Sequence, residues 1–304
     1  MKTIKRVVRI IIPTWIYHFV FNNYGKFFYW IDKSSIRHDC KSAHPNNQER
    51  YEMCLVTIAY NNDQLISKQI EMVKKHVKDP HYQLLIVDNS TDKTKRKKIQ
   101  DVCSHHQIEY ISIPFTFRQK VCKLFKWGGM SHGLALNWSF YHVIYHKRPK
   151  YFALLDHDIF PINDCNLTER LSGLDFFGVR RERDKYWYLW PGWSLFNFDA
   201  IVDRHPNFQP HFTKTTYLDS GGGNYFKIYQ NYAINTIPFP NVKTHRLKKT
   251  EGLWTWNDVY HSDCIQFIDD SWLHVINGSN YCHFAGKDDM VRKIINNIHL
   301  FERE

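Results

Sequence analysis

From residue 51 onward, short apolar runs alternate with longer segments whose apolar residues recur at helical spacing. Met53–Ala59, Gln83–Val87 and Ile108–Ile113 predict strands, and Tyr151–Leu155 predicts a fourth. Leu65–Val77 has the periodicity of a helix and stops just before an Asp-Pro pair. Strands that alternate with helices predict an α/β fold with a central, mostly parallel sheet that helices cover.

Two further helices complete this pattern, a polar one before the third strand and another at residues 131–146. The carboxyl ends of parallel strands meet at one edge of a sheet, where open α/β proteins bind their ligands. Asn61, Asp88, Asp156 and Asp158 all follow strands directly. We therefore expect these four side chains at that edge.

Asp156 and Asp158 are separated by one residue at the end of a strand. Residues two apart on a strand point the same way, so we expect both carboxylates to face one point. Carboxylates gathered in this way repel each other unless a hard cation lies near them, and Mg²⁺ or Mn²⁺ shared with substrate phosphates is the usual partner. A solvated loop end is the alternative, because so short a pattern also arises by chance.

The chain divides into three parts. Residues 51–162 hold the alternating pattern, residues 163–304 form a looser second half of the same domain, and residues 1–50 look like an N-terminal appendage. The seven cysteines are scattered and odd in number, and they include no Cys-x-x-Cys pair. This usage favours a reducing compartment, so we expect a cytoplasmic protein.

The formal net charge of +11 predicts an anionic partner such as a nucleotide or a phospholipid surface. Residues 10–21 form an apolar stretch behind four basic residues, and this stretch is shorter than the about 20 residues that span a bilayer. It fits peripheral contact with the inner face of an anionic membrane, or a helix packed on the domain. The sequence has no zinc-finger or aromatic RNA-binding signature, so we expect no nucleic acid partner.

Four segments occur in an order that is typical of one enzyme family. They are Thr57–Asn62, Ile86–Asp92, His132–Asn137 and Leu155–Asp158. Together they resemble the nucleotide-sugar-binding half of GT-A glycosyltransferases, most closely the inverting family 2 group. The likeness is good over residues 52–162 and loose over residues 163–290, and it implies the Rossmann-like GT-A fold.

The resemblance implies contacts with the nucleotide. Asp88 would accept hydrogen bonds from the base or ribose, and Asn61, His132 and Asn137 would lie beside the nucleotide. A helix N-cap is the alternative for Asp88, although Asp92 also fits that role. A plain packed helix explains His132 and Asn137 nearly as well.

The resemblance also implies a metal site. Asp156 would meet ribose or metal, and Asp158 would coordinate the Mn²⁺ or Mg²⁺ that bridges the diphosphate. His283 and Lys287 resemble a C-terminal His-x-x-Gly segment of metal-dependent members, in which the His binds metal and a nearby Lys contacts the diphosphate. His274 is the substitute for His283.

An inverting transfer needs a base that takes the proton of the acceptor hydroxyl. The acidic pair that usually supplies it in the family is missing here, and Asp219 is its nearest counterpart in order. An ordinary turn is the alternative for Asp219, and Asp269–Asp270 is another acidic pair. Retention of configuration therefore stays open.

The second half of the chain also holds the expected sugar contacts. Trp190 and Trp193 lie between the metal motif and the candidate base, and sugar rings stack on aromatic faces. Gly221 and Gly222 form a pliable turn just after that base. We predict that these four residues bind substrate, with burial in the core as the alternative for the tryptophans.

The sequence thus predicts a metal-dependent glycosyltransferase. It would move a sugar from a nucleoside-diphosphate donor, UDP-linked rather than GDP-linked, to a hydroxyl of a glycan or lipid-linked acceptor. Two alternatives stay open: a catalytically inactive GT-A domain that binds sugar nucleotide or glycan, and a basic nucleic-acid-binding protein.

Overall fold

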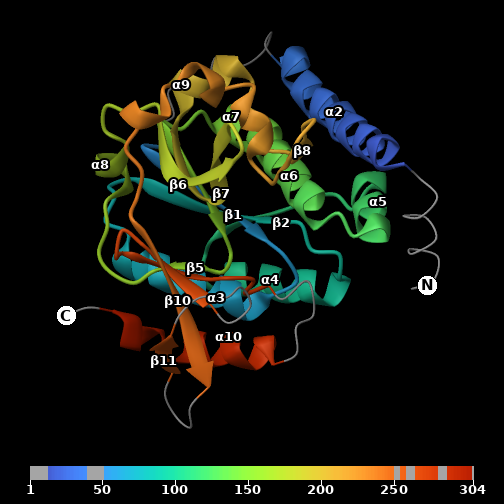
Figure 1. Cartoon of the computed structure of the whole chain (residues 1–304). Helices are drawn as coiled ribbons and strands as arrows, with labels where there is room; N and C mark the ends of the chain where they lie inside the picture. The colour runs from blue at the N-terminus through green and yellow to red at the C-terminus, as the bar shows by residue number, and fades with distance from the viewer. Residues whose placement is uncertain (1–12, 40–50, 250–253, 258–263, 280–285, 303–304) are drawn as a thin grey trace.

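A six-stranded sheet forms the centre of the computed structural model, which describes residues 13–39, 51–249, 254–257, 264–279 and 286–302 (Figure 1). The strand order is β3-β2-β1-β4-β7-β6. Strands β1 to β4 are parallel, β7 is antiparallel to β4, and β6 is antiparallel to β7. The strands are β1 Met53–Ala59, β2 Tyr82–Asp88, β3 Glu109–Ser112, β4 Tyr151–Asp156, β6 Phe176–Arg183 and β7 Tyr186–Asn197. The predicted α/β class with a central, mostly parallel sheet is confirmed.

A second, antiparallel sheet has the order β11-β10-β12-β13-β5 and lies with α10 on the outer side of α3 and α4 (Figure 1). Its strands are β5 Ile159–Pro161, β10 Val242–Lys249, β11 Trp254–Asn257, β12 Cys264–Ile268 and β13 Trp272–Val275. A two-stranded ribbon pairs β8 His211–Phe212 with β9 Tyr217–Leu218.

Helices cover both faces of the central sheet (Figure 1). The α-helices are α2 Thr14–Asp39, α3 Asp63–His76, α4 Lys93–His105, α5 Phe117–Phe125, α6 Gly128–Ser139, α7 Tyr145–Lys147, α8 Leu167–Leu171, α9 Phe198–Ile201 and α10 Lys287–Asn296. A π-helix, η1 Phe140–Ile144, joins α6 to α7. The 3₁₀ turns are η2 Val202–Arg204, η3 Gly222–Tyr225, η4 Tyr229–Asn231, η5 Ile234–Thr236 and η7 Ile298–Phe301.

Side-chain caps start the first two crossover helices. The Asn62 side chain accepts a hydrogen bond from the Leu65 backbone N–H at 3.1 Å where α3 begins. Asp92 accepts from the backbone N–H groups of Thr94 and Lys95 at 2.8 and 3.1 Å where α4 begins. These caps satisfy N–H groups that lack partners within the helix. The N-cap role that the sequence suggested for Asp92 is confirmed.

Successive residues of the central strands face opposite helical layers, as the pleat of a strand requires. Leu55 and Ile86 pack towards α3 and α4, whereas Val56 and Val87 pack towards α6 and η1. All four side chains are fully buried. Both faces of the central strands are therefore covered by packed side chains, and the sheet is open at its edges.

The β6–β7 hairpin extends past the carboxyl end of β4. Leu155, next to the end of β4, pairs with Trp193, and β7 begins earlier, at Tyr186, which pairs with Arg183. Because β7 is antiparallel to β4, its first residues lie beyond the end of β4. This half of the hairpin therefore stands over the edge where ligands bind in α/β sheets.

Helix α2 packs on the domain, one of the two arrangements that the sequence left open for this region. Phe21 and Phe28 are buried against Trp127 of the segment between α5 and α6. Asp32 is also buried and accepts hydrogen bonds from Arg118 Nη1 on α5 at 2.9 and 3.0 Å. Helix α5 itself was not predicted. Within the described ranges, no helix is both long and apolar enough to cross a membrane.

Candidate active site

The site lies at the carboxyl edge of the central sheet, beside the β6–β7 hairpin. Asp156 is the last residue of β4, and Asp158 follows in the turn that leads to β5. The turn, and not the alternation of a continuing strand, therefore sets the direction of Asp158. This differs from the expected geometry because β4 ends at Asp156, two residues before Asp158.

Asp156 pairs with His132 of α6. The distance between His132 Nε2 and Asp156 Oδ1 is 3.1 Å. Burial acts against a charged imidazole, but the Asp156 carboxylate outweighs it and raises the pKa of His132. Burial likewise acts against ionisation of Asp156, and His132 outweighs it and lowers the pKa of that carboxyl. The structure thus brings His132 to the first carboxylate of the pair.

Asp158 is almost completely buried, with 6 % of its surface exposed. Its Oδ2 accepts a hydrogen bond from the Gly278 backbone N–H at 2.8 Å. Burial, and then the neighbouring Asp156 carboxylate, raise the pKa of Asp158 to about 7. Two carboxylates this close in a buried site are costly when both are charged, and a bound cation would relieve that cost.

His274 of β13 faces Asp158 and is held by Gln266 of β12. The Gln266 amide nitrogen donates to Thr244 Oγ1 at 3.0 Å, so its oxygen faces His274 Nδ1 at 2.9 Å and accepts that proton. His274 Nε2 therefore carries the lone pair, and it lies 3.9 Å from Asp158 Oδ1. Burial lowers the pKa of His274 to about 3, so the ring is neutral.

This facing pair fits a divalent cation. A lone pair opposite a carboxylate is repulsive unless positive charge lies between them. Metal ligands of these types bind at about 2.1 Å, so an ion fits between two atoms 3.9 Å apart. In the part of the chain that the structure describes, no three His, Cys, Asp or Glu side chains form a complete metal site by themselves. Substrate oxygens would have to complete the coordination, as phosphates commonly do for Mg²⁺.

Lys287 lies beside these groups at the start of α10. Only 2 % of its surface is exposed. Burial has the largest effect on the pKa values of Asp158 and His274, and the Lys287 ammonium lowers both. Lys287 thus adds a buried cation to the surroundings of Asp158 and His274. His283, the metal ligand expected from the sequence, lies outside the described residues.

The β6–β7 hairpin contributes Arg181 and Trp190. The Arg181 guanidinium carbon lies 5.1 Å from the centre of the Trp190 ring, and the same ring is 4.6 Å from the His274 imidazole. Burial lowers the pKa of Arg181, whereas the carboxylates of Asp219 and Asp156 raise it. Arg181 is therefore a cation within electrostatic reach of both carboxylates.

Sequence reasoning missed Arg181 and Gln266. Arg181 stands in a run of charged residues, Arg180–Arg183, which is typical of a solvated surface. Strand alternation predicts that the side chains of Arg180 and Arg181 point to opposite faces of the sheet, but it does not predict which of the two faces the site. Gln266 has no motif, and its role follows from the pairing of β12 with β13, which sets it opposite His274.

Gly192 allows Trp190 and Asp156 to approach each other. A Cβ atom at this position would lie 2.2 Å from Trp190 Cζ2 and 2.6 Å from Asp156 Oδ2. Real Cβ atoms essentially never come within 3.0 Å of another heavy atom. Only glycine therefore fits here without displacing the ring and the carboxylate.

Asp219 lies directly after β9 and is exposed to solvent. Its Oδ1 accepts hydrogen bonds from the Ser220 backbone N–H at 2.8 Å and from the Tyr217 hydroxyl at 3.3 Å. Its carboxylate acts on His132 and on Arg181, although burial has the larger effect on both of their pKa values. Asp219 is thus a solvent-exposed carboxylate at the border of the site.

Asp269–Asp270, the other acidic pair, occupies the turn between β12 and β13. Asp269 is 3.3 Å from Arg170, and Asp270 is 3.1 Å from Lys243. These ion pairs give both carboxylates structural partners.

Asp88 and Asn61 have partners within the chain. Asp88 is fully buried, and its carboxylate accepts hydrogen bonds from the Ser90 N–H at 2.7 Å and from the Tyr110 hydroxyl at 2.8 Å. Asn61 Oδ1 accepts from two backbone N–H groups of the β2–α4 loop, both at 3.2 Å. Both side chains shape the loop that follows β2.

Asn137 and the glycine turn also make structural contacts. The Asn137 side chain is buried and accepts from the Phe208 N–H at 2.8 Å. Gly221 has a φ of 90°, and a Cβ there would lie 2.6 Å from the Leu189 carbonyl oxygen. A Cβ at Gly222 would meet the side chain of the preceding strand β9 at 2.3 Å. These residues hold segments in place, and their contact with substrate stays a prediction.

Trp193 belongs to the core, which corrects the expectation that it stacks on a sugar. Only 1 % of its surface is exposed, and its ring centre lies 5.9 Å from that of Phe177 and 6.0 Å from that of Trp272. Its pairing with Leu155 turns it to the buried face of the sheet on the α3 side. Trp190, outside that pairing, is the tryptophan that reaches the site.

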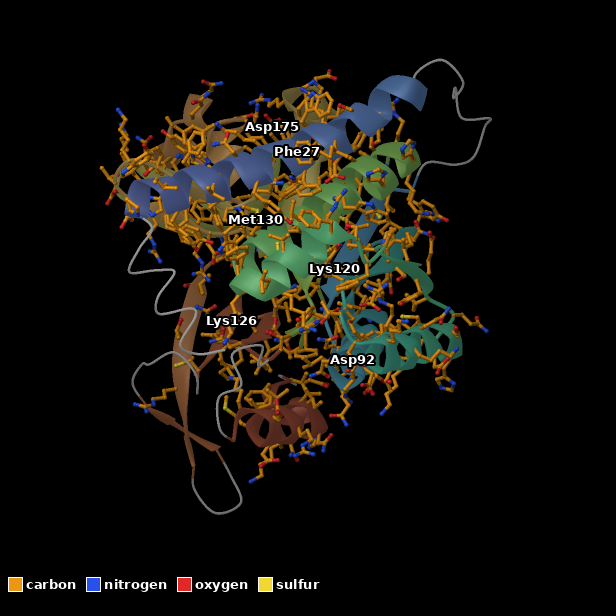
Figure 2. The ribbon with its side chains drawn as sticks, turned by 90° about the vertical axis from the view of Figure 1, so that its right-hand side faces the viewer. Phe27, Asp92, Lys120, Lys126, Met130 and Asp175 are labelled. Carbon is orange, nitrogen blue, oxygen red and sulfur yellow. The ribbon has the colours of Figure 1, made fainter. Side chains whose placement is uncertain are left out.

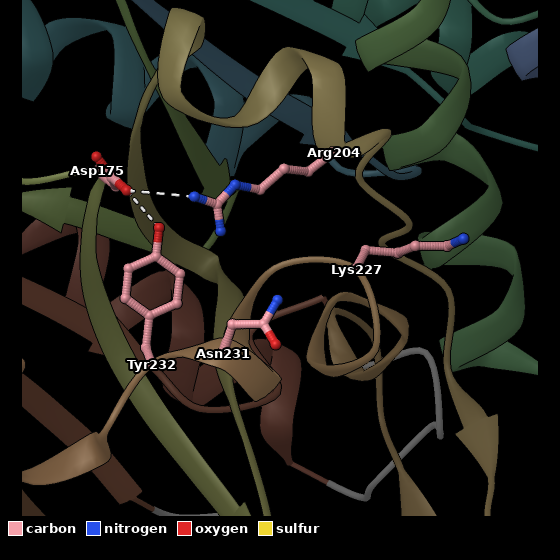
Figure 3. Close-up of a pocket in the computed structure, with 5 residues that line it drawn as sticks. All are labelled: Asp175, Arg204, Lys227, Asn231 and Tyr232. Carbon is pink, nitrogen blue, oxygen red and sulfur yellow. Dashed lines mark hydrogen bonds and ion pairs between the residues drawn. The ribbon is translucent and has the colours of Figure 1, made fainter.

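A separate polar cavity of about 500 Å³ lies at the opposite edge of the sheet (Figure 3). Its lining residues are Asp175, Arg204, Lys227, Asn231 and Tyr232. Asp175 contacts the Tyr232 hydroxyl and lies 3.8 Å from Arg204. Because β6 runs in the same direction as β4, the residue before β6 lies at the amino edge, away from Asp156. This cavity is not part of the candidate site.

The sequence matches no protein-family model. No curated protein matches it either. Among solved structures, it resembles the mannosyltransferase PcManGT from Pyrobaculum calidifontis in complex with GDP-Man and Mn²⁺, at 14 % identity and a TM-score of 0.38. That overlap covers 67 % of this chain and 58 % of the other.

Two other solved structures are glycosyltransferases as well. The mannosyltransferase Ktr4p from S. cerevisiae is 9 % identical, with a TM-score of 0.34, over 49 % of this chain and 57 % of the other. The galactosyltransferase LgtC, with donor and acceptor sugar analogs, is 14 % identical, with a TM-score of 0.32, over 49 % of this chain and 59 % of the other. Because the TM-scores are below 0.5, the function of this chain has to follow from its own residues.

Proposed function

We propose that this chain is a metal-dependent glycosyltransferase of the GT-A type, which transfers a sugar from a nucleoside-diphosphate donor to a hydroxyl group. The main support is the facing pair of Asp158 and His274, 3.9 Å apart at the carboxyl edge of the sheet, with Asp156 beside it. Arg181 and Lys287 add two cations to the same place. A diphosphate has the anionic oxygens that a metal ion, a guanidinium and an ammonium all bind.

Asp158 and His274 would hold Mn²⁺ or Mg²⁺ together with diphosphate oxygens, and Asp156 would meet the ribose or the same ion through them; His274 takes the role that the resemblance implied first for His283. The bound ion would supply positive charge that stabilises the departing nucleoside diphosphate. Arg181 and Lys287 would bind further diphosphate oxygens. Gln266 would keep the lone pair of His274 on Nε2 through the hydrogen bond at Nδ1.

Asp219 is the base in this proposal. It would take the proton of the acceptor hydroxyl while that oxygen attacks the anomeric carbon and the bond from this carbon to the diphosphate oxygen breaks. Ser220 and Tyr217 donate to Oδ1, so Oδ2 is the oxygen that would accept the proton. Direct attack opposite the leaving group would invert the anomeric configuration.

The nucleoside would lie against the loop after β2 that Asp88 and Asn61 shape, with His132 and Trp190 nearer the sugar. A UDP-sugar is the donor that we propose, on the sequence resemblance, and the acceptor would be a glycan or a lipid-linked saccharide. The protein would work in the cytoplasm, in peripheral contact with the inner face of an anionic membrane.

Release of nucleoside diphosphate from a panel of UDP- and GDP-sugars with Mn²⁺ tests this proposal. Asp158→Asn keeps the size of the side chain but removes a ligand, so release should fall at least about 100-fold. Asp101→Asn is the matched control, because Asp101 is an exposed residue of α4 that pairs with Lys97 four residues before it. It should release nucleotide like the wild type.

The outcome separates the alternatives. If no donor of the panel gives release and none gives a thermal shift, the glycosyltransferase proposal is refuted. A thermal shift with one donor, but no turnover with any acceptor, would support the catalytically inactive GT-A domain. That alternative is favoured by the missing acidic pair around Asp219.

A further inference from the structure

Exposed large hydrophobic side chains gather on one part of the surface. Of the twelve in the described residues, nine lie on α2, on α5 or in the segment just before α5. They are Trp15, Phe19, Val20, Phe27, Trp30, Phe115, Phe117, Leu124 and Phe125. Soluble monomers rarely expose large contiguous apolar patches, so this concentration indicates a binding surface.

Helix α2 carries aromatic residues on two opposite faces. The inner face packs on the domain through Phe21 and Phe28. Trp15, Phe19 and Trp30 are 69, 64 and 61 % exposed, and at 100° per residue they fall within an arc of about 60° on the outer face. Packing explains the inner rings only, because the outer rings touch solvent along the length of the helix.

Helix α5 extends this surface beside α2. Arg118 joins the two helices through its hydrogen bonds with Asp32, and the Tyr24 hydroxyl donates to the Arg118 carbonyl at 2.8 Å. Phe117 and Leu124 of α5 are 68 and 63 % exposed. Figure 2 looks onto this side of the molecule, where Phe27 of α2 and Lys120 of α5 are labelled. We call the outer residues of the two helices the α2–α5 face.

The α2–α5 face is basic as well as aromatic. Lys26, Lys120, Lys123 and Lys126 are all exposed on it or at its end. Among the side chains described on α2 and α5, Asp32 is the one carboxylate, and it is buried against Arg118. Aromatic rings with lysines and no exposed acid match the headgroup layer of an anionic bilayer.

We propose that the α2–α5 face docks on anionic phospholipid, with its Trp and Phe rings at the depth of the headgroups and its lysines on the lipid phosphates. Trp is favoured at that depth because its ring is apolar and its N–H is polar. This site lies on the packed helix itself, and does not depend on the residues before Pro13.

Docking would also place the candidate base near the bilayer. The inner side of α2 holds the β8–β9 ribbon, because Asn22 exchanges two hydrogen bonds with the backbone of Phe212, at 2.8 and 2.9 Å. The Phe21 ring lies 6.1 Å from that of Tyr217 in β9, and Asp219 follows this strand. Helix α2 would then lie between the bilayer and this ribbon. If the proposed function holds, the acceptor is therefore a saccharide that is linked to a membrane lipid and extends past α2 to Asp219.

Flotation of the full chain with vesicles of phosphatidylcholine, with and without about 30 % phosphatidylglycerol, tests the docking. The wild type should float with the anionic vesicles only. Lys120→Gln/Lys126→Gln should weaken binding about 25-fold, since each lysine near an anionic surface contributes about fivefold. Lys93→Gln/Lys98→Gln, which removes two exposed lysines from α4, is the matched control and should bind like the wild type.

A second variant tests the rings. Trp15→Ser/Phe19→Ser/Trp30→Ser should weaken binding at least about 100-fold. Phe226→Ser/Leu300→Ser removes exposed apolar side chains elsewhere and should change nothing. Equal vesicle binding by Trp15→Ser/Phe19→Ser/Trp30→Ser and by Phe226→Ser/Leu300→Ser would overturn the inference. It would also be overturned if the wild type formed a stable dimer without lipid and the Trp15→Ser/Phe19→Ser/Trp30→Ser variant did not. Thermal unfolding midpoints show that each variant folds.

Vesicle binding needs no donor, so Asp158→Asn should float like the wild type. Flotation of a protein that has no transferase activity would uphold the α2–α5 face and refute the proposed function. Transfer to soluble acceptors by a protein that does not bind vesicles would uphold the proposed function and overturn docking through the α2–α5 face.

Discussion

Replacing Gly192 with alanine tests whether the site depends on the close approach of Trp190 and Asp156. The new Cβ would lie 2.2 Å from Trp190 Cζ2 and 2.6 Å from Asp156 Oδ2, whereas ordinary contacts begin at 3.4 Å. The ring would have to move by about 1.2 Å and the carboxylate by about 0.8 Å. A misplacement of about 1 Å can lower a catalytic rate about 100-fold. Moving two side-chain ends lowers the free energy of unfolding by only about 1–3 kcal/mol.

We therefore expect Gly192→Ala to reduce donor hydrolysis about 100-fold while the protein stays folded in urea titrations. Gly173→Ala is the matched control. Gly173 has a φ of 74° and no atom within 4 Å of its would-be Cβ, so alanine there costs about 1 kcal/mol of backbone strain and should not change the rate. Trp190→Phe, added to Gly192→Ala, removes the clashing Cζ2 atom and should restore part of the rate. A Gly192→Ala rate within twofold of the wild type would refute this reasoning.

Three further substitutions test other parts of the account. Gln266→Leu removes the acceptor at His274 Nδ1 and should weaken Mn²⁺ binding about 10- to 100-fold in calorimetric titrations; unchanged affinity would argue against His274 as a ligand. Arg118→Met removes the guanidinium partner of the buried Asp32, leaving His142 at 3.4 Å, and should lower the free energy of unfolding in urea by about 3 kcal/mol; a loss below about 1 kcal/mol would show that the ion pair is unimportant. Asn62→Ala removes the α3 cap and should cost about 1 kcal/mol by the same titration, with no change in the urea dependence of ΔG; no loss would mean that the cap is dispensable.

The sequence predicted the first half of the fold well, because that half obeys local rules. The strands β1, β2 and β4 and the helix α3 follow from apolar runs and periodicity, and the β-strand ends gave the edge of the sheet where Asp156 and Asp158 lie. Helix α5 was missed because its exposed face carries Phe117 and Leu124, so its apolar residues do not mark a single buried side.

The rest of the site depends on contacts between distant parts of the chain. His274 meets Asp158 because β13 pairs with β5, which follows the Asp-x-Asp turn. Arg181 comes within electrostatic reach of Asp156 and Asp219 because the β6–β7 hairpin extends past the end of β4. Such pairings between distant strands cannot be read from one sequence. The same is true of the pairing between β4 and β7, which buries Trp193, a residue that the sequence favours as a sugar contact.

The central claim is that Asp158 and His274 hold a divalent cation shared with a nucleoside diphosphate. Its most direct test is the electron paramagnetic resonance signal of free Mn²⁺, titrated with the protein in the presence of UDP or GDP. We expect that the wild type with one of these nucleotides removes the free signal, and that Asp158→Asn and His274→Gln each bind Mn²⁺ at least about tenfold more weakly. Equal Mn²⁺ binding by the wild type and both variants would rule out a metal site at Asp158 and His274.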